Sequence, residues 1–385
     1  MSDPAHHLFP PGTGADAARL PTGILPDAAI RRLVRAREIV AHPELEPDQI
    51  QPASLDLRLG SKAWRVRASF LPGPNATVLD KIAALDAHEI DLTNGAVLER
   101  NCVYVIPLQE ALALKGATVG FANPKSSTGR LDILTRLITD RGTAFDQVER
   151  GYEGPLYAEI APRTFSVVVR PGTRLNQLRF RRGSPVIALA DLEELYEAGQ
   201  LVSVEEGRGA LRAGHVGVSI DLRGPGGGAL VGWRARKHTD RIDLARIAAY
   251  DPLDFWEPIH AHRSESIILD PDEFYILATR EAVRIPPAFA AEMLAYDTSV
   301  GEFRVHYAGF FDPGFGCDPD GHGSRAVLEV RSHEVPFMLE HGQTIGWLRY
   351  ERMAAAPDRL YGTGEIRSNY QNQGLKLAKQ FRAVG

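Results

Sequence analysis

Cysteine is almost absent from this sequence. Only two of its 385 residues are cysteines, Cys102 and Cys317. Two cysteines exclude a disulfide framework and a multi-cysteine zinc cluster, and they fit a reducing compartment. We therefore expect a cytoplasmic protein.

An excess of positive charge and long apolar runs are also lacking. The 44 Lys and Arg residues are outnumbered by 49 Asp and Glu residues, which gives a net charge of -5. Nothing therefore attracts the whole chain to a nucleic-acid polymer, and any anion site must be local. No apolar run is long enough to span a membrane, and residues 1–23 lack the charged and apolar regions of a signal peptide.

What the sequence does contain is an internal repeat. "PASLDLRLG" at 52–60 is matched by "GVSIDLRG" at 217–224, and "SSTGRL" at 126–131 by "TSVGEF" at 298–303. A chain of this length can hold two domains, each with its own core. The repeat favours duplication, although common strand patterns can also coincide by chance.

Each half consists of short segments rich in Val, Ile, Leu, Tyr and Phe, bounded by Gly, Pro, Asn or Asp. This pattern predicts an all-β fold, here two tandem β domains at 1–195 and 205–385. Helical patterns are few. We expect helices near 26–40, 190–199 and 241–250, the second of them joining the halves.

A turn at Gly129 concentrates hydrogen-bond donors. Lys125, Ser126, Ser127 and Arg130 surround it, a set that suits a phosphate chain. The P-loop spacing is absent. A plain polar surface turn is the alternative interpretation.

Glu159 lies in "LYAEI", an alternating strand with aliphatic neighbours. A carboxylate held against apolar surface gains proton affinity and can act as a general acid or base near neutral pH. Alone, such a glutamate is more often the outward side of a strand.

Four motifs together resemble the dCTP deaminase branch of the dUTPase-like superfamily. They are "NPKSSTGR", "GYEGPLYAEI", "RPGTRLNQLRF" and the C-terminal "YGTGEIRSNYQNQGLKLAKQF". The resemblance implies duplicated dUTPase-like β-barrel domains, assembly into trimers, and active sites between adjacent domains. It also implies hydrolytic deamination of dCTP to dUTP and ammonia, which supplies thymidylate synthesis.

By this resemblance, three residues carry catalysis. Glu159 would take a proton from the water that attacks C4 of cytosine. Ser126 would orient that water, and Arg130 would stabilise the ionised glutamate.

The resemblance also implies substrate contacts. Lys125 and Ser127 would hold phosphates, and Gln177 would line the base pocket. Asp146 looks like the aspartate before a ribose-facing hairpin, with a longer spacing than usual, and Arg141 is a further candidate in that loop.

The C-terminal motif resembles a segment that closes over the triphosphate, and it places Tyr361 and Gln373 at phosphate-contacting positions. Asn369 stands where the family has a lysine, and Lys376 is a possible substitute. A disordered polar terminus is the alternative.

The second half departs from the catalytic pattern. Glu302 replaces the arginine of the turn, and an anion there would repel both triphosphate and a catalytic carboxylate. Glu329 nevertheless matches Glu159, and "GFFDPGFG" at 309–316 keeps the hairpin pattern. We prefer Glu159 as the base because its half retains Ser126 and Arg130, and the choice between the two glutamates stays open.

Zinc-dependent deamination is excluded because no cysteine pair completes a zinc site. We expect Mg²⁺ to enter with the nucleotide, dCTP and dUTP as small-molecule partners, dTTP as a possible inhibitor, and a homotrimer. Two alternatives remain: a dUTP diphosphatase or bifunctional enzyme, and a non-catalytic nucleotide-binding regulator.

Overall fold

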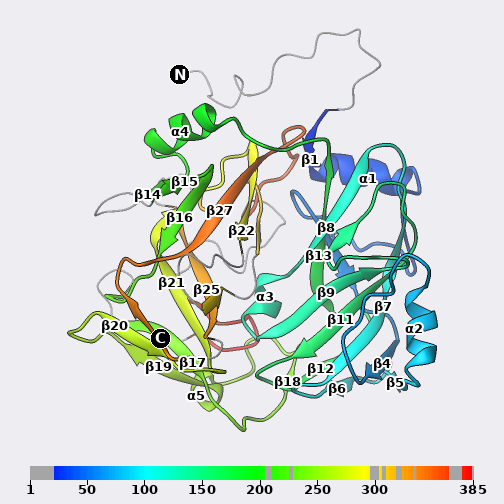
Figure 1. Cartoon of the computed structure of the whole chain (residues 1–385), viewed down its shortest axis with the longest axis horizontal. Helices are drawn as coiled ribbons and strands as arrows, with labels where there is room; N and C mark the ends of the chain where they lie inside the picture. Colours follow the sequence, from blue (N-terminus) through cyan, green and yellow to red (C-terminus); the bar gives the residue numbers. More distant parts are fainter. Residues whose placement is uncertain are drawn as a thin grey trace.

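The computed structural model describes residues 21–203, 210–224, 229–294, 303–305, 309–317, 323–332, 335–363 and 375–383 (Figure 1). The chain is mostly β-strand, as predicted. Of the helices in these ranges, none is both long enough and apolar enough to cross a membrane.

The described part of the first half, residues 21–182, contains thirteen strands and three helices. The strands are β1 (Gly23–Ile24), β2 (Ile39–Ala41), β3 (Leu55–Arg58), β4 (Lys62–Val66), β5 (His88–Asp91), β6 (Ala96–Leu98), β7 (Val103–Ala113), β8 (Thr118–Pro124), β9 (Ile133–Thr139), β10 (Gln147–Val148), β11 (Glu153–Pro162), β12 (Val167–Val169) and β13 (Arg174–Arg182). The helices are α1 (Asp27–Arg35), α2 (Val78–Ala84) and α3 (Ser126–Gly129).

After the connecting helix α4 (Leu189–Glu197), the described part of the second half repeats this plan. Its strands are β14 (Val202–Ser203), β15 (Leu211–Arg212), β16 (His215–Ser219), β17 (Leu230–Ala235), β18 (Ile242–Asp243), β19 (Trp256–His260), β20 (Ser266–Leu269), β21 (Phe274–Val283), β22 (Phe289–Leu294), β23 (Phe303–Val305), β24 (Phe310–Phe311), β25 (Ser324–Ser332), β26 (Phe337–Glu340) and β27 (Thr344–Arg352), with helix α5 (Pro252–Phe255).

The two halves have the same sheet topology. The order β5-β4-β7-β11-β9 in the first half is repeated as β19-β17-β21-β25-β23 in the second. The registers agree as well, since Trp64 lies opposite Val105 and Trp233 lies opposite Ile276. The repeat read in the sequence is therefore a structural duplication.

Both glutamates occupy the same place in this duplicated ladder. Glu159 on β11 pairs with Val105, and Glu329 on β25 pairs with Ile276, the equivalent residue. Both side chains are buried. Local strand structure therefore does not distinguish them.

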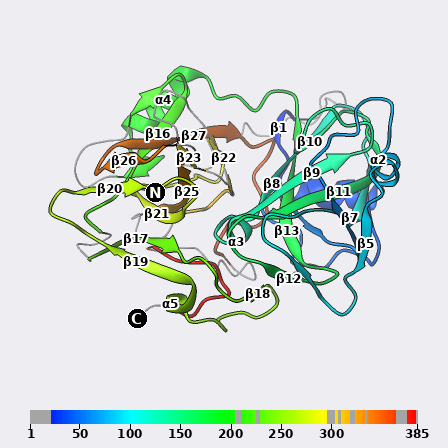
Figure 2. The same cartoon turned by 60° about the horizontal axis from the view of Figure 1, so that its bottom comes forward.

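The halves share a hydrophobic core as well as having cores of their own. Phe165 of the first half packs against Phe255 and Trp256 of the second, with ring centroids 5.8 and 5.3 Å apart. Phe381, near the C-terminus, completes the aromatic cluster at 5.5 Å from Phe255. Figures 1 and 2 show α3 between the halves, and α2 at the far edge of the first half.

Two of the three expected helices form, as α1 and α4. The helix expected at 241–250 was wrong, because this segment contains β18 and turns. Ile242 pairs in parallel with Val167 of the first half, and Asp243 with Val168. Pairing across the halves therefore overrides the local helical pattern.

Candidate active site

A cavity of about 940 Å³ lies between the halves, and both halves line it. From the first half come Asp56, Lys125, Ser126, Arg130, Arg174 and Gln177. From the second come Phe310, Asp312, Glu329, Tyr361 and Lys379. The two domains that line this cavity belong to a single chain.

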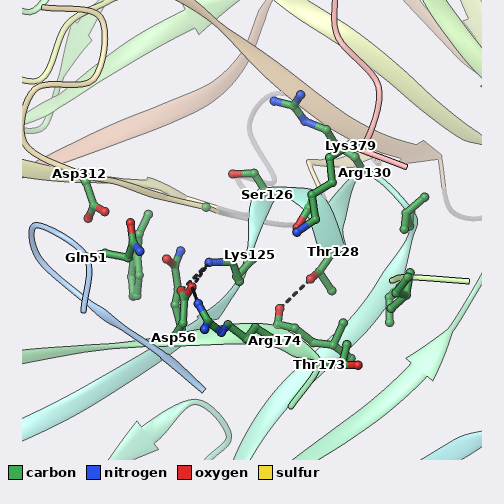
Figure 3. Close-up of a pocket in the computed structure, with 18 of the residues that line it drawn as sticks. Gln51, Asp56, Lys125, Ser126, Thr128, Arg130, Thr173, Arg174, Asp312 and Lys379 are labelled. Carbon is green, nitrogen blue, oxygen red and sulfur yellow. Dashed lines mark hydrogen bonds and ion pairs between the residues drawn. The ribbon is translucent and has the colours of Figure 1, made fainter. Parts of the chain in front are cut away.

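The donor-rich turn forms α3, a single helical turn at the cavity wall (Figure 3). A buried hydrogen bond holds this turn in place: Thr128 donates its hydroxyl hydrogen to the carbonyl of Leu175 at 2.7 Å. Ser126 is exposed toward the cavity, and Ser127 is buried beside it. A polar surface turn does not describe this arrangement.

Arg130 and Glu329 meet across the boundary between the halves. The Nε atom of Arg130 lies 3.9 Å from Oε1 of Glu329, and both side chains are buried. Burial raises the pKa of Glu329 to about 8, although the Arg130 charge opposes the shift. Arg130 also donates to the carbonyl of Lys376 at 2.8 Å, which ties the C-terminal segment to this place. A carboxyl group with a pKa near neutrality is suited to proton transfer.

Three cations gather at another part of the cavity. Lys125 forms an ion pair with the buried Asp56 (Figure 3). Arg174 donates to Asp48 at 2.8 Å. Burial lowers the pKa of Lys379, and the charge of Lys125 lowers it further. Cations held close together in this way favour a bound anion.

Lys379 reaches the cavity because the last described segment is firmly docked. Ala248 donates its backbone N–H to the carbonyl of Lys379 at 3.0 Å, and Ala249 donates to that of Gln380 at 2.9 Å. Leu377 and Phe381 are buried in the shared core. In the described segment 375–383, Lys379 lines the cavity and Lys376 does not.

The remaining walls place two more of the predicted residues. Gln177 on β13 accepts a hydrogen bond from the Ser54 hydroxyl at 3.3 Å. The ring of Tyr361 packs 5.6 Å from that of Phe315 in the second-half hairpin, and both residues line the cavity. The predicted positions of Gln177 and Tyr361 in the pocket are consistent with this geometry.

Glu159 does not line the cavity, and the structure does not bring it to Ser126 or Arg130. It lies opposite Arg136 on β9, which donates from Nε to Oε1 at 3.1 Å. The Arg136 guanidinium in turn stacks 3.7 Å above the ring of Phe145. The second carboxylate oxygen is buried and accepts no hydrogen bond from the described residues.

The reason is that the same sheet face has different partners in the two halves. In the first half Trp64, Val66, Val103, Val105 and Tyr157 pack together with Val78 and Ile82 of α2. In the second half the equivalent Trp233, Ala235, Phe274, Ile276 and Val327 pack into the core of the first half. Helix α2 therefore covers the face that carries Glu159, while the face that carries Glu329 borders the cavity.

Asp146 and Arg141 are also absent from the cavity lining. Asp146 accepts the backbone N–H of Leu137 at 2.7 Å, and burial raises its pKa to about 7. Arg141 is a turn residue with φ of 58° whose N–H binds the carbonyl of Ala76. The second-half hairpin instead brings Asp312 to the cavity wall.

Two predicted features cannot be placed. Gln373 and the second-half turn at 298–302 lie outside the described residues. In the part of the chain that is described, no group of three or more His, Cys, Asp or Glu side chains could hold a metal ion.

Sequence reasoning missed Asp56, Arg174, Asp312 and Lys379. Asp56 lies in the "DLR" segment that both halves contain and Asp312 in the "FFDPG" hairpin, so the repeat carried a signal for both. Arg174 and Lys379 have other basic residues near them in the sequence, and only the tertiary structure shows that these two line the cavity.

Comparisons with known proteins agree with the duplicated plan. Residues 21–184 match the family "2'-deoxycytidine 5'-triphosphate deaminase (DCD) N-terminal domain", and residues 189–381 match the corresponding C-terminal domain. The crystal structure of 2'-deoxycytidine 5'-triphosphate deaminase from Agrobacterium tumefaciens is 56% identical with a TM-score of 0.84. The match covers 90% of this chain and 99% of that one.

Curated relatives align with smaller parts of the chain. A "dCTP deaminase, dUMP-forming" of Beutenbergia cavernae is 32% identical over 137 residues, 35% of this chain and 62% of the relative. A "dCTP deaminase" of Haloarcula marismortui is 29% identical over 160 residues, 41% of this chain and 79% of the relative. The matches to the first curated relatives thus span about three fifths of their length. With both of its domain models and a near full-length structural relative matched, this chain belongs to the dCTP deaminase family.

Proposed function

We propose that this protein deaminates dCTP hydrolytically, giving dUTP and ammonia. The observation that carries the proposal is the meeting of Ser126 and Arg130 from one half with Glu329 from the other in a single cavity. The names of the relatives and the family models support the same substrate.

In this mechanism Glu329 accepts a proton from water while the oxygen attacks C4 of the cytosine ring, and it passes that proton to the ring nitrogen N3. The carboxylate then accepts the proton of the new C4 hydroxyl and passes it to the departing amine, so that ammonia leaves and the C4 carbonyl forms. Arg130 stabilises the ionised carboxylate and the charge that develops during attack. Ser126 orients the water with its exposed hydroxyl.

Lys125, Arg174 and Lys379 provide the charge that holds the triphosphate. Asp48 and Asp56 are already bound to Arg174 and Lys125. Mg²⁺ that arrives with the nucleotide is therefore held by phosphate oxygens more than by these carboxylates. Asp312 takes the ribose-facing role that the sequence suggested for Asp146.

The pH dependence of the wild-type enzyme tests the role of Glu329. Its pKa is raised to about 8 by burial, and a general base must be ionised in the free enzyme. We therefore expect kcat/KM for dCTP to rise about tenfold per pH unit below that pKa and to level off above it. Initial rates of ammonia release across this range are the measurement, and a flat profile through neutrality would contradict the assignment.

The products test the reaction itself. We expect one ammonia for each dCTP consumed, with dUTP as the uracil nucleotide, when both are followed by a coupled ammonia assay and ion-exchange chromatography. Activity should survive treatment with a zinc-specific chelator, because the chemistry assigned to Glu329 uses no transition metal. Zinc-dependent recovery after complete loss would overturn the mechanism.

A bifunctional enzyme is the second candidate, favoured by relatives named "dCTP deaminase, dUMP-forming". Pyrophosphate released in step with ammonia, with dUMP in place of dUTP, would establish it. Binding of dCTP without any turnover would instead support a non-catalytic nucleotide-binding regulator.

A cytoplasmic location, inhibition by dTTP and a homotrimer stay predictions. The cavity described here is lined by both halves of one chain, so the proposed chemistry does not require a second chain. Light scattering of the purified protein measures the assembly.

A further inference from the structure

Arg179 is a buried arginine that connects the two halves beneath the cavity. It lies on β13, two residues after Gln177, and side chains at this spacing share one face of a strand. Its exposed fraction is 1%. Burying a guanidinium this deeply is costly unless its donors are satisfied, so its contacts need an explanation.

Among the described residues, the side-chain contacts of Arg179 all lie in the second half. The guanidinium donates to the carbonyl of Ala291 at 3.1 Å and to that of Phe311 at 3.3 Å. It also donates to Oδ1 of Asp312 at 3.2 Å and lies 4.0 Å above the ring of Phe310. A single first-half side chain therefore holds three consecutive residues of the second-half hairpin.

These contacts fix both strands of one ladder. Ala291 on β22 and Phe311 on β24 are paired with each other, and the two ends of the guanidinium bind one carbonyl on each strand. Arginine is suited to this because its planar fork presents several donors in a fixed geometry. Phe310, Phe311 and Asp312 all line the cavity.

The same arginine affects the charge of Asp312. Burial raises the pKa of Asp312, and the charge of Arg179 and its hydrogen bond oppose that shift. An ionised Asp312 can only accept hydrogen bonds, which is the form suited to a sugar hydroxyl.

We propose that Arg179 is a positioning residue for the sugar of the substrate. From its strand in the first half, it fixes the position of Asp312 and of the second-half hairpin at the cavity wall. This inference rests on the proposed function. It adds that discrimination at the sugar 3′-hydroxyl depends on a residue buried behind the hairpin.

Comparing dCTP with 2′,3′-dideoxy-CTP, which lacks the 3′-hydroxyl, tests the inference. We expect Arg179→Met to lower kcat/KM for dCTP by about 100-fold, the scale of a small misplacement of substrate. Dideoxy-CTP should be affected much less, so the preference for dCTP should fall towards one. Arg179→Lys keeps the charge but loses the fork, and it should recover part of the preference.

Arg181→Met is the matched control. Arg181 lies on the same strand and stacks on Phe121 at 4.0 Å, within its own half. We expect it to leave the preference for dCTP unchanged. If Arg179→Met and Arg179→Lys lower the rates with both nucleotides equally, Arg179 is only structural and the inference is wrong.

Arg179→Met leaves Asp312 buried without its cation, which lowers the free energy of unfolding. The double variant Arg179→Met/Asp312→Asn removes that charge and should show the same loss of preference as Asp312→Asn alone. Additive losses in this cycle would contradict coupling of the two residues. If the wild-type protein binds but does not deaminate, calorimetric affinities for the two nucleotides still decide the role of Arg179, separately from the proposed function.

Discussion

Glu329→Gln will abolish deamination of dCTP, with kcat lowered by about 10³-fold or more, because glutamine cannot take a proton from water. The amide is close to isosteric with the carboxyl group, and the site is buried at the boundary of the two halves. Binding of dCTP should therefore persist. Steady-state ammonia release and calorimetric binding of dCTP are the two measurements.

The chain supplies its own matched control for this experiment. Glu159 occupies the equivalent ladder position in the first half, but it borders α2 and pairs with Arg136. We expect Glu159→Gln to change kcat by less than about twofold, since the substitution lies outside the cavity. Loss of turnover in Glu159→Gln with full activity in Glu329→Gln would reverse the assignment.

Arg130→Met should have the second largest effect, lowering kcat by about 10²- to 10³-fold. The substitution removes the cation that offsets the burial of Glu329, so the pKa of that carboxyl will rise above its wild-type value. A base with a higher pKa is protonated over a wider pH range. The acid limb of the kcat/KM profile should therefore move to higher pH. Rates measured across that limb give the shift.

Arg136→Met is the control for this second prediction. Arg136 stands beside Glu159 as Arg130 stands beside Glu329, and it does not line the cavity. Its removal leaves a buried carboxylate without its partner, which lowers the free energy of unfolding. We expect a lower melting temperature with an unmoved pH profile. An equal shift of the profile in both variants would argue against a specific contact between Arg130 and Glu329.

The fold class could be predicted from the sequence because its signals are local. Alternating apolar residues and turn residues define the strands, and the repeated segments define the duplication. The helix expected at 241–250 failed for the opposite reason. Its backbone pairs with Val167 and Val168 across the halves, and a pattern within ten residues carries no information about that partner.

The candidate site could be predicted only in part. Ser126 and Arg130 could be named from the sequence because both belong to one short motif that resembles the family's turn. Asp312 and Lys379 were missed because they reach the cavity from a different half and from the end of the chain. Asp146 does not line the cavity, because the hairpin that reaches it belongs to the second half.

The sequence by itself determined that Glu159 and Glu329 occupy equivalent positions on two repeated strands, because strand alternation and the repeat place them alike. Only the tertiary structure decided which of them meets Arg130. In the first half α2 packs over the glutamate's face, whereas in the second half that face packs on the first half and borders the cavity. Two residues with the same strand position and register can be distinguished only by the elements that pack against them. Those elements are distant in the chain.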